Sequence, residues 1–491
     1  MKTLKKTLKK TLKKTLKIKR TKKNSQTLNK TSIKMRGFYT SIHNKLNLFK
    51  INKNSGLSKF LEYMYLQFLE KQKLINTINI EKSRIFENNS DLINTKLTAI
   101  INAHLSSSIY IDKSILTYIN NNLNNCKIVT YENIIGEQKF VFDFIIYDKI
   151  NIKKLDAIVK NMLLFLQVLI KISNNETTNS NICCKNGIQV IFFLTPFQKK
   201  LDLDLKNSEI LGAKNVNSGF NYPCIKNGLT IIYRKEEFFK VFIHESIHAY
   251  GVDKALQHDL NSNNNYIKLI NLFAISNKDY FGINESLTEF WAFLSHLCLY
   301  SFIKSLNLNT FLTNFERFYV IEVKHSLYQI AKILHYNGLT YNELINNSLR
   351  LYTFKSPTKS AFISDKDNTY HAISEGIIKF SETSHIFSYY ILKLLLVINH
   401  EQLFTSLFID LNDIKLKKDF INKFFNYLHD YALDPKFIKM IGIMSETYKN
   451  DLYKLNKINK INKINKERLA RKSNMKHLLT NLKMMTLDYE L

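Results

Sequence analysis

The stretch Arg234–Gly251 reads R-K-E-E-F-F-K-V-F-I-H-E-S-I-H-A-Y-G and decides how the rest of the chain must be arranged. It contains the pattern H-E-x-x-H as His244, Glu245 and His248. Residues four apart lie one turn apart on the same face of a helix, so both imidazoles can reach one metal ion, and Glu245 then points beside that ion. The stretch therefore predicts a helix that binds a zinc ion.

The neighbours of the pattern indicate that this helix is buried. Glu236 and Glu237 are expected in its first turn, where carboxylates stabilise the helix dipole, and Gly251 is expected to end it. Two imidazoles inside an apolar helix are costly without a partner, and a metal ion supplies one. The surrounding side chains are apolar on nearly all sides: Phe238, Phe239, Val241, Phe242, Ile243, Ile247 and Tyr250.

A third ligand is expected elsewhere, because catalytic zinc usually has three protein ligands and an open position. The spacing H-E-x-x-H-x-x-G-x-x-H would need a histidine at position 254, where Lys254 stands, and Asp253 remains an alternative. The better candidate is Glu285, in the stretch G-I-N-E-S-L-T-E that begins at Gly282, with Glu289 one turn later on the same face. The alternative role for Glu285 is to stabilise the first turn of its own helix.

These two motifs resemble those of the gluzincin zinc metallopeptidases. In thermolysin-like members, H-E-x-x-H is followed by a second helix carrying G-x-x-N-E-x-x-S-D or close variants, and G-I-N-E is similar to it in form. The resemblance implies that His244, His248 and Glu285 bind zinc. It also implies that Glu245 is the general base. Glu289 stands where that family has an aspartate that orients a zinc histidine, so it is expected to contact a ligand without binding the metal.

The same resemblance implies a histidine or tyrosine donor from a later helix. The stretch S-H-I-F-S-Y-Y supplies His385 and Tyr389 as candidate catalytic residues, beside Tyr390, and Tyr370 with His371 is another pair. The sequence does not choose among them. His296 lies seven residues beyond Glu289 and is expected to be a core histidine.

Patterns of alternating apolar residues predict a small sheet before the metal-binding helix. The edge strand, if paired as in zincins, would bind an extended substrate. The expected strands are Lys127–Ile135 and Lys139–Asp148, joined as a hairpin near Gly136, then Gln189–Leu194, an irregular edge strand at Ala213–Tyr222, and Thr230–Tyr233. Within the edge strand, Val216–Phe220 is the part expected to pair with substrate.

Helical patterns cover most of the remaining chain, namely Leu57–Leu105, Leu155–Ser173 and nearly everything from Glu236 to Asn450. This order of helices, a small sheet and more helices predicts an α+β fold. We expect a zincin-like domain followed by a mostly helical C-terminal subdomain. The expected divisions are a basic tail at 1–36, a helical region at 37–125, the sheet with the H-E-x-x-H helix at 126–255, the helical subdomain with the third ligand at 256–450, and a basic tail at 451–491.

The 491 residues are 45% hydrophobic, enough for a large core, and carry a net charge of +30. Fifteen basic and no acidic residues lie in 1–36, where a K-T-L-K repeat could form an amphipathic helix on an anionic surface. The alternatives for this tail are a solvated segment, an arm for nucleic acid or a membrane surface, and a mitochondrial-type presequence. The K-I-N repeat after Asp451 is interpreted in the same way.

The five cysteines include no C-x-x-C pair, which favours a reducing compartment and opposes a cysteine zinc site. Cys183 and Cys184 are expected to be buried as small apolar residues. No apolar run reaches the length of a membrane span, and the N-terminus lacks a secretory h-region, so an intracellular protein of the cytoplasm or a virion is expected. The composition, rich in Asn, Ile and Lys, resembles that of uncharacterised proteins of giant DNA viruses.

The sequence thus predicts a zinc-dependent metallopeptidase that acts on a peptide or protein substrate. Water activated by the metal would attack the carbonyl, with Glu245 as the general base. The alternative is a catalytically inactive protein of the same fold that binds nucleic acid through its basic tails.

Overall fold

The computed structural model describes residues 30–41, 55–78, 80, 82–86, 91–173, 183–203, 209–253, 263–345, 379–410, 415–416, 419–459, 466–489 and 491. Most of the expected N-terminal tail lies outside these residues. So do three of the residues considered above, Lys254, Tyr370 and His371.

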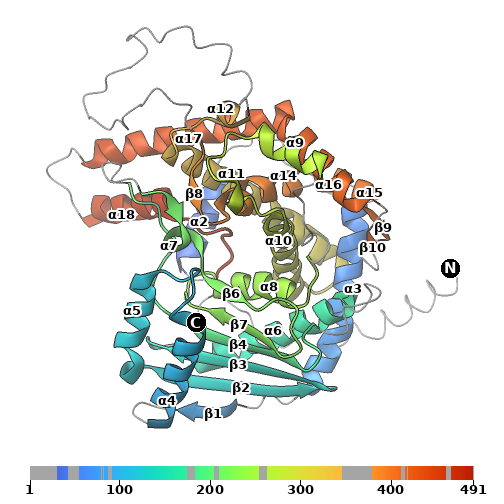
Figure 1. Cartoon of the computed structure of the whole chain (residues 1–491), viewed down its shortest axis with the longest axis vertical. Helices are drawn as coiled ribbons and strands as arrows, with labels where there is room; N and C mark the ends of the chain where they lie inside the picture. Colours follow the sequence, from blue (N-terminus) through green and yellow to red (C-terminus); the bar gives the residue numbers. More distant parts are fainter. Residues whose placement is uncertain are drawn as a thin grey trace, which may run out of the picture.

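A six-stranded mixed sheet forms the lower part of the molecule in Figure 1. β3, β4 and β7 are parallel to one another, and the other neighbours pair antiparallel. The fold is therefore α+β, as predicted. In spatial order the strands are β1 (Lys82–Phe86), β2 (Lys127–Ile135), β3 (Gln138–Ile146), β4 (Gly187–Phe193), β7 (Gly228–Ile232) and β6 (Gly219–Asn221).

The predicted hairpin is confirmed: β2 and β3 pair from Lys127↔Ile146 to Ile135↔Gln138, and Gly136 has a φ of +62° in the turn. Two expectations for the sheet were wrong in detail. β1 lies inside the stretch expected to be helical, where pairing with the edge of β2 outweighs the weak local pattern. The edge strand begins at Gly219, because Ala213–Val216 forms the short helix α7.

Both faces of the sheet are covered by helices. On one face, Phe142, Phe192 and Ile232 pack with α6 (Ile152–Ser173) and α8 (Phe238–Ala249) in the main core. On the other face, Ile145 and Ile191 belong to a second cluster with α4 (Asp91–Ile100), the π-helix η2 (Ile101–Leu105) and α5 (Lys113–Asn121). The predicted motif helix therefore lies directly on the sheet.

The rest of the described chain is mostly helical, and α10 packs against α8, α11, η8, α14 and α3. Two small sheets interrupt it, β5 (Leu211–Gly212) with β8 (Glu382–Thr383) and β9 (Phe408–Asp410) with β10 (Lys415–Leu416). The remaining elements are α2 (Lys30–Ser41), α3 (Gly56–Thr77), the 3-10 turns η3 (Leu123–Asn125) and η7 (Lys278–Tyr280), α9 (Asn264–Leu272), α10 (Ile283–Ile303), α11 (Leu308–Tyr336), α12 (Tyr341–Ile345), the π-helix η8 (Ser388–Leu392), α14 (Lys393–Ile398), α15 (His400–Leu407), α16 (Phe420–Ala432), α17 (Pro435–Asn459) and α18 (Lys466–Thr480).

None of the helices in the described part of the chain is long and apolar enough to cross a membrane. The cysteines differ from expectation in one respect. Cys183 and Cys184 are both buried as predicted, but Cys183 is also bonded to Cys224, which lies in the turn between β6 and β7. This disulfide ties the β6–β7 hairpin to the chain that enters β4.

The end of the chain is not a solvated tail. Residues 481–489, which we call the C-terminal segment, lie in the core, and the expectation for 451–491 is wrong there. The burial of this segment is hard to predict from the sequence, because a lysine repeat precedes it and the apolar pattern begins only near Leu478. The buried apolar residues of the segment are Leu482, Met484, Met485, Leu487 and Tyr489.

Buried carboxylates hold the backbone of the C-terminal segment. Glu237 accepts hydrogen bonds from the N–H groups of Met484 (3.1 Å) and Met485 (2.7 Å), and Glu322 accepts one from Thr486 N–H (2.8 Å). These bonds replace the ladder partners that an irregular buried segment lacks. Glu237 itself precedes α8 with a φ of 57° and no side-chain cap, so the expected role of its carboxylate in the first helical turn is also wrong.

We expect Leu482→Ala to lower the free energy of unfolding by about 2 to 5 kcal/mol, because Leu482 is fully buried. Leu306→Ala is the matched control: Leu306 is 71% exposed, and its loss should change that free energy by less than about 0.5 kcal/mol. Urea denaturation of both variants makes the comparison. Equal, small effects would mean that the C-terminal segment is not part of the core.

Candidate metal centre

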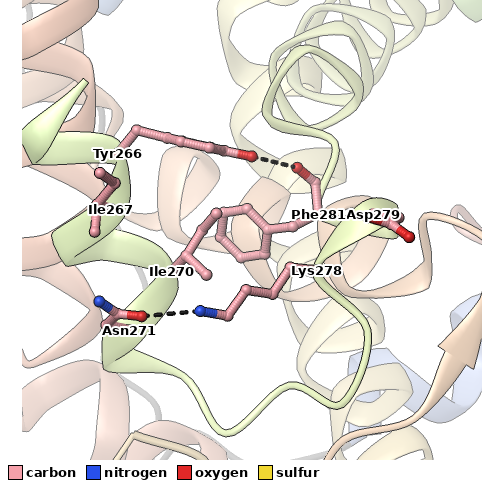
Figure 2. A pocket seen from close by; sticks show the side chains of 7 residues that line it. All are labelled: Tyr266, Ile267, Ile270, Asn271, Lys278, Asp279 and Phe281. Carbon is pink, nitrogen blue, oxygen red and sulfur yellow. Dashed lines mark hydrogen bonds between the residues drawn. The ribbon is translucent and has the colours of Figure 1, made fainter. Parts of the chain in front are cut away.

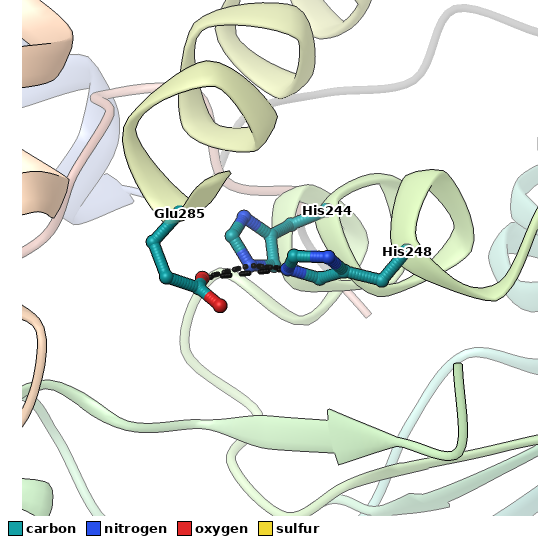
Figure 3. A group of neighbouring side chains, drawn as sticks. All are labelled: His244, His248 and Glu285. Carbon is teal, nitrogen blue, oxygen red and sulfur yellow. Dashed lines mark hydrogen bonds and ion pairs between the residues drawn. The ribbon is translucent and has the colours of Figure 1, made fainter. Parts of the chain in front are cut away.

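Helices α8 and α10 bring together the three predicted ligands, although 37 residues separate His248 from Glu285. Figure 3 shows His244 and His248 one turn apart on α8, facing Glu285 at the start of α10. Their side chains are only 7%, 10% and 15% exposed. The three ligand side chains therefore lie in a site that is largely closed to solvent.

The three atoms are spaced as the ligands of one small cation would be. His244 Nε2 and His248 Nε2 lie 3.1 Å apart, and Glu285 Oε2 lies 3.4 Å from the first and 3.3 Å from the second. Ligands at about 2.0–2.1 Å from a tetrahedral zinc ion are separated by about 3.3 Å. The residues present thus fit a divalent metal ion in both donor type and spacing.

The contacts of the Nδ1 atoms of His244 and His248 explain why their Nε2 atoms act as acceptors. His248 Nδ1 lies 2.8 Å from Asp253 Oδ2, and His244 Nδ1 lies 3.1 Å from Glu289 Oε1, within ion-pair distance but off the line of a hydrogen bond. A proton on each Nδ1 leaves a lone pair on each Nε2. Two lone pairs and a carboxylate oxygen then converge on one point, which a cation would stabilise.

The local electrostatics favour positive charge at this point. Burial alone would lower the pKa of both imidazoles, but Glu289 and Glu285 raise that of His244, and Glu285 and Asp253 raise that of His248 well above its usual range. Burial would raise the pKa of Glu285, yet the two imidazoles hold it well below its usual value. A proton or a metal ion is therefore strongly favoured among these three side chains.

Glu245 lies beside the ligands and is held by the edge strand. Its Oε2 accepts a hydrogen bond of 2.6 Å from Asn221 Nδ2, and the same amide contacts the Glu245 carbonyl at 3.2 Å. Burial raises the pKa of the Glu245 carboxyl, while His244, His248 and Asn221 lower it in part. A carboxyl with a raised pKa is a better proton acceptor at neutral pH than an exposed one.

Of the two candidate donors, Tyr389 packs against a ligand, and His385 packs against the turn before α10. The Tyr389 ring lies 6.0 Å from that of His244, edge to face, and His385 lies against Gly282, where a Cβ would come within 2.8 Å of His385 Nδ1. Gly282 is therefore needed for the close approach of His385 to the start of α10. His385 Nδ1 lies 2.9 Å from the carbonyl of Tyr280 and must donate to it.

Two other residues considered from the sequence, Tyr390 and His296, have different surroundings. Tyr390 donates its hydroxyl to the carbonyl of Leu482 in the C-terminal segment. His296 is fully buried between Phe239 and Tyr489, and burial lowers its pKa to about 3, so it is a core residue as expected.

Sequence reasoning assigned no role to Asn221 or Lys240, and it considered Asp253 only as a ligand. Lys240 had a recognisable signal, since it is the one lysine of a mostly apolar helix and precedes His244 by four residues. Asn221 reaches the site only through the tertiary fold, whereas Asp253 lies in the turn that follows α8, five residues after His248.

A pocket of about 430 Å³ lies between α9 and the turn before α10 (Figure 2). Tyr266 donates to the carbonyl of Phe281 (3.4 Å), and Lys278 donates to Asn271 (3.0 Å) across its lining. These contacts brace the turn that carries Gly282. The metal ligands do not line the pocket, so we place the chemistry at the His244, His248 and Glu285 group.

No family model matches this chain, and neither a curated protein nor a solved structure is found to match it. Its fold is α+β, but many functions share such folds, so function has to be argued from the site.

We expect His244→Ala, His248→Ala and Glu285→Ala each to weaken zinc binding by more than about 100-fold, because changes outside the ligands already cost about 10- to 100-fold. Glu245→Gln should keep one zinc per chain. His429→Ala, which changes a half-exposed histidine of α16, is the control and should bind zinc as the unaltered chain does. Isothermal titration calorimetry measures all five. A ligand variant that binds zinc as tightly as the unaltered chain would show that the altered residue is not a ligand.

Proposed function

We propose that the protein is a zinc-dependent metallopeptidase that resembles the gluzincins, with a zincin-like arrangement of sheet, motif helix and third-ligand helix. The observation that carries this proposal is the convergence of His244 Nε2, His248 Nε2 and Glu285 Oε2 within 3.4 Å, with Glu245 beside them. A bound zinc ion supplies Lewis-acid activation of water and of a carbonyl oxygen. Two histidines and a glutamate are a known ligand set of catalytic zinc.

The edge strand supports a peptide as the substrate. β6 ends the sheet, and Tyr233 N–H bonds to Ser218 O and Tyr222 N–H to Leu229 O, so the backbone groups of Gly219 and Asn221 point away from β7. An extended peptide could pair with that edge. Because the Asn221 side chain also binds Glu245, a peptide in this position would pass beside the general base.

Within such a complex, Glu245 would accept the proton of the attacking water and later deliver it to the leaving amine. Asn221 orients the carboxylate for this role, since its amide donates to Oε2. The nearly complete burial of the three ligands and Glu245 keeps bulk water away and strengthens these interactions.

Tyr389 is the better of the two donors for the developing oxyanion. Burial raises its pKa well above the usual value, and the carboxylates of Glu285 and Glu245 raise it further, so the hydroxyl keeps its proton. His385 already donates through Nδ1 to the Tyr280 carbonyl, which ties its ring to the turn before α10. The ring of Tyr389, in contrast, packs edge to face on that of His244. We therefore assign the donor role to Tyr389 and a supporting role to His385.

The alternative, an inactive protein that binds nucleic acid through basic tails, depends on the termini. Residues 1–29 lie outside the described residues, and the end of the chain is buried in the core. The site retains a complete ligand set and a base, which an inactive protein would not need. Peptide cleavage and DNA binding, measured on the same protein, distinguish the two functions.

We expect Glu245→Gln to retain zinc and to lower kcat for peptide cleavage by about 10²- to 10⁴-fold, which is the usual contribution of a general base. Mass spectrometry of a peptide library incubated with each protein detects the cleavage. Undiminished cleavage by the variant would refute the assigned role of Glu245. Salt-sensitive DNA binding by the unaltered zinc-loaded chain, with no peptide cleaved, would favour the alternative.

We expect Tyr389→Phe to lower kcat by about 10²- to 10³-fold with little change in KM, because a donor to the transition state is lost. His385→Gln is the comparison, since a glutamine can still donate to the Tyr280 carbonyl, and it should cost less than about tenfold. Steady-state kinetics on one cleaved peptide decides between them. A larger loss in the His385 variant would reverse the assignment.

A further inference from the structure

Lys240 is a buried charge one turn before His244 on the same helix. It is 1% exposed, and its sequence neighbours on α8 from Phe238 to Ile243 are all apolar. Its Nζ donates to Glu289 Oε1 and lies 3.1 Å from Met484 Sδ of the C-terminal segment. A lysine in such surroundings is costly unless its charge is paired. The pairing partner is the carboxylate that faces His244.

We infer that Lys240 is a positioning residue of the metal centre, which holds Glu289 so that Glu289 fixes the ring of His244. The inference rests on the proposed function, since it assumes that His244 binds zinc. Glu289 Oε1 is shared between Lys240 Nζ and His244 Nδ1, which lies 3.1 Å away. Its Oε2 has no hydrogen-bond partner among the described residues. The position of the Glu289 carboxylate therefore depends on the contacts of its Oε1, one of which is the ion pair with Lys240.

The length of the Glu289 side chain explains why a lysine is needed here. The gluzincin pattern has an aspartate at this position, and a glutamate adds one more rotatable bond. A longer arm holds an imidazole less firmly unless a second contact removes the added freedom. The ion pair with Lys240 is that second contact, and it holds the carboxylate in place.

Lys240 also connects the metal centre to the C-terminal segment. Met484 touches Lys240 through its sulfur atom and bonds to Glu237 through its backbone N–H. Glu237 immediately precedes α8, so the segment is attached to the same turn of the helix as Lys240. The contacts Met484, Lys240, Glu289 and His244 form a continuous chain from the end of the polypeptide to a ligand.

A second buried lysine provides a matched control. Lys332 on α11 is fully buried, and its Nζ donates to the Asn481 carbonyl at the start of the C-terminal segment (2.6 Å). Among the described residues, its Nζ contacts the Asn481 carbonyl and the face of the Tyr328 ring, not Glu289 or His244. Lys240→Met and Lys332→Met each remove one buried ammonium group that contacts this segment. Only the first removes the contact to the metal centre.

Zinc affinity by competition with a chelator, together with the absorption spectrum of the cobalt-loaded chain, tests the inference on the full-length protein. We expect Lys240→Met to bind zinc about 10- to 100-fold more weakly and to change the cobalt spectrum, because the orientation of a ligand is lost. Lys332→Met should remain within about threefold of the unaltered chain and keep the spectrum, even if it unfolds at lower urea. Equal losses in both variants, or no loss in Lys240→Met, would overturn the inference.

A comparison of Lys240→Met/Glu289→Gln with Glu289→Gln keeps the inference testable if Lys240→Met alone does not fold, since the double variant removes both buried charges. If the lysine acts only through Glu289, the double variant should bind zinc within about threefold of Glu289→Gln. A further tenfold loss would contradict that route. An unaltered chain that binds no zinc would overturn the proposed function and this inference together, whereas tight binding that is insensitive to Lys240 would overturn the inference alone.

Discussion

The convergence of three acceptor atoms, His244 Nε2, His248 Nε2 and Glu285 Oε2, is the constraint on which the rest of the structure depends. Lone pairs that lie 3.1 to 3.4 Å apart in a site largely closed to solvent repel one another unless a positive charge lies among them. The fold maintains this arrangement because α8 lies on the sheet and α10 packs across it. Neither helix could move without separating the ligands.

Around this centre the protein buries an unusual number of charged groups, and they are paired in a consistent way. Asp253 and Glu289 face the outer nitrogens of the two imidazoles, and Lys240 neutralises Glu289. Buried carboxylates are costly, so each must be matched by a cation or by backbone N–H groups. Glu237 shows the second solution, since it receives two N–H groups from the C-terminal segment. The end of the chain is therefore part of the support of the centre.

The sequence was sufficient for the parts of the structure that short-range periodicity determines. The spacing of His244 and His248 places both on one helical face, and the β2–β3 hairpin follows from alternation around Gly136. Glu285 could be found only through the resemblance of its motif, since its sequence separation from His248 does not by itself predict that the two side chains meet. Asn221 was not assigned a role, because an asparagine on an edge strand has many other uses and its contact with Glu245 exists only in the folded state.

The C-terminal segment shows a different limit. Lysines at intervals of three before it give the composition of a solvated tail, and the apolar run that follows is too short to identify as core. Its burial depends on acceptors supplied by Glu237 and Glu322, which lie far away in the sequence. The pairing of Cys183 with Cys224 is of the same kind, because cysteine spacing does not reveal connectivity.

The most direct test of the central claim is anomalous diffraction at the zinc edge from crystals of the zinc-loaded chain. The account predicts one peak per chain, within about 2.0 to 2.2 Å of His244 Nε2, His248 Nε2 and a carboxylate oxygen of Glu285. A peak bound by other side chains, or a Glu285 carboxylate turned away from a zinc ion that the two imidazoles hold, would contradict it.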